Sequence, residues 1–187
     1  MSEIRPQTRD AIIEAAFQIF GGNPGASLAD VAERAGVGRA TLHRHFSGRD
    51  DLMVELARTA VRELDAAIDT AVADAPSHSE ALRLSLKAII PLASRQWFLA
   101  REPVEDDPGV TADYERQMRE LSDAIDAAKS EGCFGADVPT AWIAQAYDGV
   151  IYAAWEMVRA GDATPNQAAA LAWRTLTTGL GAPDHDQ

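Results

Sequence analysis

The chain has 187 residues, of which 47% are hydrophobic, and it carries 17 Lys and Arg against 29 Asp and Glu, for a net charge of −12 at pH 7. This length allows one or two domains with a sizeable core, and no run approaches the ~18–20 apolar residues of a membrane span. The first residues, MSEIRPQTRD, lack the apolar core of a signal peptide, and the single Cys133 cannot form an intrachain disulfide. We therefore expect a cytoplasmic protein with no membrane partner.

The first predicted element is an amphipathic helix over residues 8–20. Its apolar side chains recur with the period of a helix, at Ile12, Ile13, Ala16, Ile19 and Phe20. The sequence Asn-Pro-Gly at 23–25 then predicts a turn, so a separate element should begin near residue 27.

Two short helices around a glycine turn are predicted over residues 27–46, SLADVAERAGVGRATLHRHF. Ser27 can cap the first helix with Asp30 as its capping-box partner, and Gly36 is placed to end it. Leu42 can dock the second helix, and the spacing Ala-x3-Gly-x5-Leu over 32–42 fits a helix-turn-helix. The outward positions of the second helix all carry hydrogen-bond donors suited to phosphates and base edges: Arg39, Thr41, His43, Arg44 and His45.

The rest of the chain predicts further helices and no strand. Ser77 and Glu80 form a second capping-box pattern, Pro91 should break or kink the helix that follows, and Thr164-Pro165 marks another helix start. The segments predicted as helical are 49–73, 77–90, 97–99, 111–130, 137–160 and 165–180, with an acidic loop at 102–109. The expected fold is all-α, with about nine helices.

The run from Thr8 to Leu52 resembles the N-terminal domain of the TetR family of bacterial repressors. The matching segments are Ala15-Ala16-x2-Ile19-Phe20, Asp30-Val31-Ala32-x2-Ala35-Gly36-Val37, Thr41-Leu42-x-Arg44-His45-Phe46 and Arg49-Asp50-x-Leu52. The resemblance implies a DNA-binding domain over 1–48 and a C-terminal domain for ligand binding and dimerisation over 49–182. A disordered tail is expected over 183–187. The chain departs from the family where His43 replaces a common tyrosine, and where Gly48 and Arg49 replace the usual cap and lysine.

On this basis we predict a set of DNA contacts. Gly38 would let the backbone approach the DNA closely, and Arg49 would keep a charge that attracts phosphate. Leu42 and Phe46 are expected in the core rather than on bases. The predicted DNA-binding residues are Ser27, Gly38, Arg39, Thr41, His43, Arg44, His45 and Arg49.

The negative charge lies entirely outside the predicted DNA-binding part. Residues 1–50 hold six Arg and six acids and sum to zero, whereas residues 51–187 hold eleven Lys and Arg against twenty-three acids. Affinity for phosphates depends on local cations rather than on total charge. We expect modest, salt-sensitive DNA binding, unlike that of a strongly basic coat protein.

The C-terminal part is rich in aromatic side chains on predicted helices, and the resemblance implies an effector pocket there. Ordinary core packing is the alternative for each of them. The predicted ligand-binding residues are Trp97, Phe98, Tyr114, Met118, Trp142, Tyr147, Ile151 and Trp155, and polar groups that could orient a ligand are Arg95, Gln96, Gln117, Gln145 and Asp148. The acidic excess favours a cationic or neutral lipophilic effector, whose identity stays unknown.

The last two predicted helices are apolar on more than one face, which indicates burial on several sides. A helix-turn-helix that reads two half-sites needs a two-fold partner, and the resemblance implies a four-helix bundle between subunits. The alternative is that these helices only close the monomer core. The predicted dimerisation residues are Ile143, Val150, Ala154, Val158, Ala169, Ala172, Leu176 and Leu180.

The sequence contains no motif that indicates enzymatic activity or metal binding. There is no phosphate-binding glycine loop, HExxH or nucleophile elbow, so we expect no enzyme and no cofactor. His43 and His45 would point apart on a helix, so no metal site is predicted. The resulting hypothesis is a homodimeric DNA-binding regulator, expected to be a repressor that a small molecule releases. The alternatives are a helical ligand-binding or scaffold protein with a non-functional DNA head, and an all-α enzyme.

Overall fold

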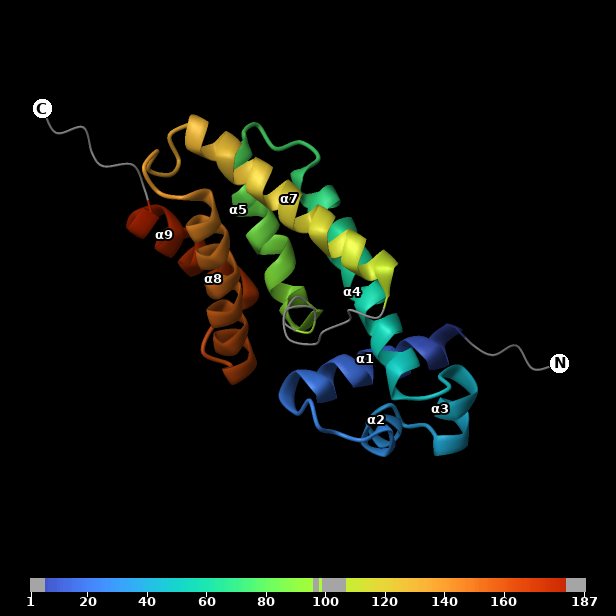
Figure 1. Ribbon diagram of the computed structural model, residues 1–187. Coiled ribbons are helices and arrows are strands. Elements are labelled where there is room, and N and C mark those ends of the chain that lie inside the picture. The colour runs from blue at the N-terminus through green and yellow to red at the C-terminus, as the bar shows by residue number, and fades with distance from the viewer. Residues whose placement is uncertain (1–5, 96–97, 99–106, 181–187) are drawn as a thin grey trace, which may run out of the picture. The chain divides into compact units, whose positions relative to one another are not determined.

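The computed structural model describes residues 6–95, 98 and 107–180, and every regular element in those residues is helical (Figure 1). The all-α prediction is therefore confirmed. The elements are α1 (Pro6–Gly22), α2 (Leu28–Arg34), α3 (Arg39–His45), α4 (Arg49–Val72), α5 (His78–Ile89), the 3-10 turn η1 (Ile90–Leu92), α7 (Pro108–Ser130), α8 (Thr140–Ala160) and α9 (Pro165–Leu180). Trp97, Gln96 and the tail 183–187 lie outside the described residues.

The described residues form two compact units. The first unit comprises residues up to Arg62 together with 94–111, and the second comprises 63–93 together with the residues from 112 onward. The division falls inside α4, beyond residue 48. The first half of α4 belongs to the first unit because Leu52 and Leu56 are fully buried in its core.

The helix-turn-helix forms for local reasons that the sequence predicts correctly. The Ser27 hydroxyl accepts a hydrogen bond from the Asp30 amide at 3.3 Å, and the Asp30 carboxylate accepts one from the Ser27 amide at 2.7 Å. This capping box starts α2. The turn after it places Gly36 at φ +68°, a conformation that costs side-chain-bearing residues energy. The predicted cap and stop are therefore both confirmed.

The core of the first unit is formed by one face of each of its helices. Ile12, Phe17 and Phe20 of α1 are buried together with Leu42 of α3 and with Phe46, which directly follows α3. The side chain of Phe98, from the 94–111 segment, completes this core and packs edge-on against Phe17 with ring centroids 5.6 Å apart. The prediction that Leu42 and Phe46 are core residues is confirmed.

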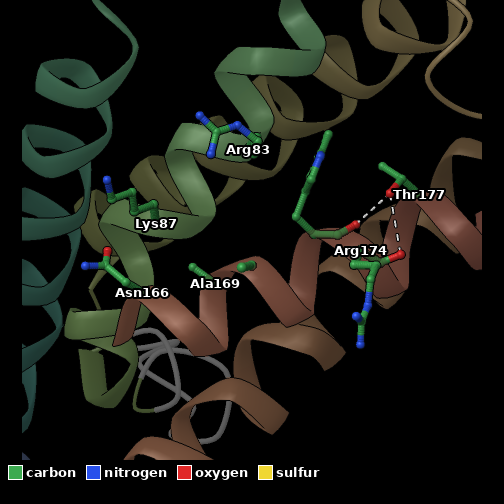
Figure 2. Close-up of a pocket in the computed structure, with 8 residues that line it drawn as sticks. Arg83, Lys87, Asn166, Ala169, Arg174 and Thr177 are labelled. Carbon is green, nitrogen blue, oxygen red and sulfur yellow. Dashed lines mark hydrogen bonds between the residues drawn. The ribbon is translucent and has the colours of Figure 1, made fainter. Parts of the chain in front are cut away.

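In the second unit, α5 and α9 lie side by side and α8 packs on α9 (Figure 2). The buried face of α8 includes Ile143 and Tyr147, and the Tyr147 hydroxyl donates a hydrogen bond to the Leu82 carbonyl of α5 at 2.9 Å. Pro91 ends α5 in a 3-10 turn, as predicted. Gly161 ends α8 with φ +83°.

The predicted capping box at the start of α5 is only half formed. The Ser77 hydroxyl accepts from the Glu80 amide at 3.1 Å, but the Glu80 carboxylate pairs with Arg83 instead of returning to the cap. Glu131, which follows α7, instead accepts from the next two amides of the helix start, those of His78 and Ser79, at 2.8 and 2.9 Å. These bonds, with one from the Ser79 hydroxyl, lower the pKa of Glu131 to about 2.

Candidate nucleic-acid interface

The outer face of α3 presents the donors that the sequence predicts. Arg39, His43 and Arg44 are exposed, Thr41 and His45 are half-buried, and the Arg44 guanidinium donates to the Thr41 hydroxyl at 3.1 Å. Leu42 is 1% exposed and holds the opposite face of α3 in the core. Five polar side chains are thus presented together on a helix that is anchored from behind.

Gly38 begins α3 in an ordinary backbone conformation. Its φ is −73°, and a Cβ placed on it would meet no atom within 4 Å. The fold itself therefore does not require a glycine there. The predicted close approach of DNA to this backbone stays a prediction, and it is compatible with the open space around Gly38.

The Ser27 hydroxyl is committed to the α2 cap, which corrects its predicted role as a free DNA contact. It donates to the Asp30 carboxylate at 2.8 Å while accepting from the Asp30 amide. The hydrogen bond from the Ser27 amide and that from its hydroxyl lower the pKa of Asp30. Ser27 therefore positions α2, and its hydroxyl hydrogen is not available to a phosphate.

The Arg49 guanidinium also points into the protein, against the prediction that it contacts phosphate. It donates to the carbonyls of Ala26 at 2.7 Å and Pro24 at 2.6 Å, and it lies 4.5 Å from the centroid of the Phe20 ring. Because these contacts occupy donors on two of its nitrogens and one face of its plane, the guanidinium has few donors left for DNA. Arg49 is a clamp between the start of α4 and the turn that leads into α2.

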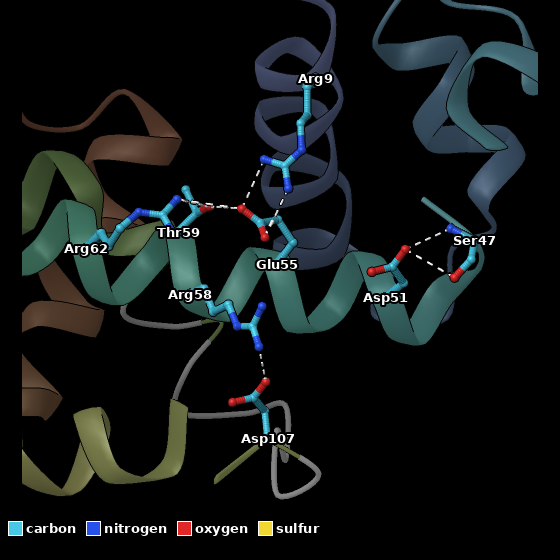
Figure 3. A network of polar contacts seen from close by, with 8 residues as sticks. All are labelled: Arg9, Ser47, Asp51, Glu55, Arg58, Thr59, Arg62 and Asp107. Atoms are coloured by element: carbon cyan, nitrogen blue, oxygen red, sulfur yellow. Dashed lines mark hydrogen bonds and ion pairs between the residues drawn. The ribbon is translucent and has the colours of Figure 1, made fainter. Parts of the chain in front are cut away.

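A network of ion pairs joins α1 to α4 (Figure 3). Glu55 accepts from Arg9 at 3.0 Å and lies 3.6 Å from Arg62. Burial alone would raise the pKa of Glu55, but the hydrogen bond and charge of Arg9 outweigh it and the pKa is lowered. Nearer the start of α4, Asp51 accepts from the Ser47 amide at 2.8 Å. The sequence contains no short-range signal for the contact between Arg9 and Glu55, because they are far apart in the chain.

Two more pairs attach the 94–111 segment to the helices of the first unit. Arg58 of α4 pairs with Asp107, which also accepts from the amides of Gly109 and Val110 and so caps α7. These bonds, led by that of Val110, lower the pKa of Asp107. Arg95 pairs with Glu14 of α1 and is therefore a structural residue of the first unit, rather than an orienting group for a ligand.

The predicted ligand-binding residues are dispersed. Phe98 is in the core of the first unit, and Trp142 is 64% exposed, so neither faces the interior of the second unit. Tyr147 and Ile151 are buried there, and burial raises the pKa of the Tyr147 hydroxyl. The remaining members, Tyr114, Met118 and Trp155, are half-buried in the second unit. These three and the two buried residues remain the predicted effector set.

The predicted dimerisation residues mostly face their own subunit. Ile143, Ala154, Ala169, Ala172 and Leu176 are buried, because α8 and α9 pack on each other and α9 on α5. Val150 and Val158 are half-buried, and the Leu180 side chain lies outside the described residues. Among the described residues, the large apolar side chains that remain exposed are different ones: Trp142, Tyr152 and Leu171. The prediction chose the inward face of these helices instead of the outward one.

Among the described residues, no helix is long and apolar enough to cross a membrane. The same residues hold no group of three or more His, Cys, Asp or Glu side chains arranged to bind a metal ion.

Sequence comparisons identify relatives along most of the chain. Residues 12–56 match the model for "Bacterial regulatory proteins, tetR family". The HTH-type transcriptional repressor LfrR of Mycolicibacterium smegmatis is 30% identical over 161 residues, covering 86% of this chain and 84% of LfrR. The HTH-type transcriptional regulator BetI of Brucella canis is 32% identical over 80 residues, covering 42% of this chain and 40% of BetI.

Solved structures agree with this relationship. The TetR-like transcriptional regulator LfrR from Mycobacterium smegmatis, in complex with proflavine, matches with a TM-score of 0.71 and 28% identity over 93% of this chain and 97% of LfrR. The ketosteroid transcriptional regulator KstR2 of Mycobacterium tuberculosis matches with a TM-score of 0.72 over 92% of this chain and 94% of its own, but its 20% identity shows the fold alone. With the exposed donors of α3, these relationships show that the chain belongs to the TetR family of bacterial regulatory proteins and is a DNA-binding transcriptional regulator.

Proposed function

We propose that this regulator is a repressor that binds a near-palindromic operator as a homodimer and is released by a small molecule. The observation that carries the proposal is the composition of α3, whose exposed face bears Arg39, His43 and Arg44 while Leu42 holds its other face in the core. The repressor role is supported by the relationship to LfrR, which is named as a repressor. Each subunit would place α3 in the major groove of one half-site.

The dimer would form through the outward faces of α8 and α9. Trp142, Tyr152 and Leu171 stand exposed there, and Ala153, which is also exposed, would let helices approach closely. Large exposed apolar side chains on neighbouring helices are typical of a surface that another protein covers. In a two-fold symmetric dimer, the two copies of α3 would be spaced to match two half-sites about one helical turn of DNA apart or more.

The effector is proposed to be a cationic or neutral lipophilic molecule with an aromatic body. The related LfrR was solved with proflavine, and the acidic C-terminal part of the present chain favours a cation over an anion at its aromatic cluster. Tyr114, Met118 and Trp155 would contact it. By linkage, the effector must bind the DNA-incompetent state more tightly, since otherwise it shifts nothing. A small movement of α4 would then change the distance between the two DNA-binding helices of the dimer.

The proposal is tested with Arg44→Ala and the matched variant Arg119→Ala, which removes an exposed arginine of α7. Fluorescence anisotropy on DNA from upstream of the gene, titrated with salt against a scrambled duplex, gives the affinity and selectivity. Losing one α3 contact costs about 1–3 kcal/mol per half-site, so Arg44→Ala should weaken binding ~10-fold or more. Arg119→Ala should bind like the wild type. Equal affinity of the two variants would refute the assignment of α3 as the reading helix.

Sedimentation at micromolar concentration tests the assembly separately. A dimer is expected for the wild type and for Arg44→Ala, because Arg44 lies outside the proposed interface. Trp142→Glu, which places a charge on that interface, should shift the equilibrium toward monomer. A wild-type monomer would remove the two-head mechanism, and a fully dimeric Trp142→Glu would show that the subunits associate elsewhere.

A further inference from the structure

A groove of about 450 Å³ lies between α5 and α9 of the second unit (Figure 2). We call it the basic groove, and it is lined by Arg83, Lys87, Asn166, Ala169, Ala170, Trp173, Arg174 and Thr177. None of the predicted ligand-binding residues lines it. Its volume is that of a small-molecule site.

The charge of the basic groove is opposite to that of its surroundings. The second unit contains seven Lys and Arg, and three of them, Arg83, Lys87 and Arg174, line this one groove. No Asp or Glu is among the lining residues. In an acidic unit, such a concentration of cations attracts anions locally, whatever the total charge.

The pairing of these cations separates the basic groove from the rest of the unit. Within the described residues, each of the four cations outside the groove has a carboxylate or carbonyl partner: Arg116 with Asp65, Arg119 with Glu115, Lys129 with the Val138 carbonyl, and Arg159 with Glu156. Inside the groove, Arg83 pairs with Glu80, whereas the described residues provide no ion pair or hydrogen bond for the side chains of Lys87 and Arg174. The two cations of the unit for which the described residues show no side-chain partner thus both line the groove.

The geometry favours an anion beside α5. Arg83 and Lys87 are four residues apart, so they share one face of the helix, and Glu80, bound to Arg83 through both carboxylate oxygens, balances only one of the two charges. Asn166 contributes an amide from α9. Arg174 stands at the rim, and Figure 2 shows its guanidinium directed away from α5. An anion held by Lys87 and Arg83 would balance the remaining charge and use Arg83 donors that Glu80 does not occupy.

Trp173 adds a flat apolar surface to the same groove. Its side chain is half-buried and packs edge-on against Phe134, with ring centroids 6.3 Å apart, which limits its movement. Ala169 and Ala170 beside it leave room for a ring to lie on the helix. A ligand that fits would therefore have an acidic group at one end and an apolar body at the other.

We propose that the basic groove binds a small aromatic carboxylate, with its acidic group at Lys87 and Arg83 and its ring against Trp173. None of the described residues of the predicted effector set lines this groove, and its ligand is an anion, whereas the proposed effector is cationic or neutral. Binding there does not depend on whether the protein is a repressor.

Isothermal titration of the full chain tests the proposal with naphthalene-2-carboxylate and the uncharged naphthalene-2-carboxamide as probes. The carboxylate should bind the wild type, more weakly as salt is added, and the carboxamide should bind at least several-fold more weakly. Lys87→Gln should weaken the carboxylate roughly tenfold, as expected for the loss of a charge-assisted contact. Arg119→Gln, which removes a cation elsewhere in the same unit, should leave binding unchanged.

Each contrary result would overturn the proposal. No heat at millimolar probe would exclude the site, and equal affinity for both probes would show that the acidic group is not recognised. Equal weakening in Lys87→Gln and Arg119→Gln would show a general charge effect instead of a site. Circular dichroism checks that both variants remain folded, which is expected because Lys87 forms no hydrogen bond within the described residues. No DNA is used, so failure of the repressor proposal cannot mimic failure here.

Discussion

Replacing Arg49 should destabilise the first unit without removing a DNA contact. Its guanidinium makes two hydrogen bonds to backbone carbonyls, at 2.6 and 2.7 Å, and stacks over Phe20. The side chain is partly exposed, so each bond contributes about 0.5–1 kcal/mol and the aromatic contact a similar amount. Arg49→Ala should therefore cost about 2 kcal/mol. Arg49→Lys keeps the charge but loses the planar fork, and should still cost about 1 kcal/mol.

Urea unfolding at fixed protein concentration measures this loss, since the stability of an oligomer depends on concentration. The salt dependence of DNA binding then separates a clamp from a phosphate contact. Each lost phosphate contact reduces the magnitude of the slope of log affinity against log salt by about 0.9, so Arg39→Ala, which removes one contact from each subunit of the proposed dimer, should reduce it by about 1.8. Arg49→Ala should leave the slope unchanged. A wild-type stability with a lowered slope would refute the reasoning and restore Arg49 as a DNA contact.

Three further substitutions test local features. Gly36→Ala should lower stability by about 1 kcal/mol because φ is +68°, whereas Gly38→Ala, at φ −73°, should change it by less than about 0.5 kcal/mol; equal losses on chemical denaturation would contradict this. The pKa of the Glu131 carboxylate is about 2 in the folded protein, so its bonds stabilise the fold fully at pH values above its ordinary pKa and progressively less as the pH falls toward 2. The difference in Tm between the wild type and Glu131→Gln should therefore shrink between pH 6 and pH 3. A difference that stays constant would exclude the pairing. Tyr147→Phe removes the donor to the Leu82 carbonyl and should cost about 1 kcal/mol with helix content unchanged by circular dichroism, whereas wild-type stability would make this bond dispensable.

The helix-turn-helix could be predicted closely because its determinants lie within a few residues of one another. Ser27 and Asp30 are three residues apart, so their reciprocal hydrogen bonds follow from the sequence pattern alone. Gly36 ends α2 with φ at +68°, a conformation that glycine adopts readily and that would strain a residue with a side chain. Leu42 and Phe46, four residues apart, face the core as one helical turn requires. The donors on the other face of α3 are therefore correctly identified as exposed or half-buried.

The same local logic fails where a side chain has a choice of partners. Glu80 has the right spacing to complete a capping box, yet it pairs with Arg83 while Glu131, more than fifty residues away in the chain, takes the helix start. The capping-box pattern predicted correctly where α5 begins, but it predicted the wrong carboxylate as the acceptor for the amides at the helix start. Only the folded chain brings Glu131, directly after α7, to the start of α5.

The sequence by itself determined the helices, their caps and the reading face of α3, since these depend on periodicity and on contacts within a turn or two. Tertiary structure alone decided where Arg49 points, because its acceptors lie more than twenty residues earlier in the chain. It also decided that Ile143 faces inward while Trp142 stays exposed. On a helix apolar on several faces, composition does not distinguish the face that meets α9 from the face left for a partner. Which face is buried depends on which helix packs against it, and this packing is a property of the folded chain.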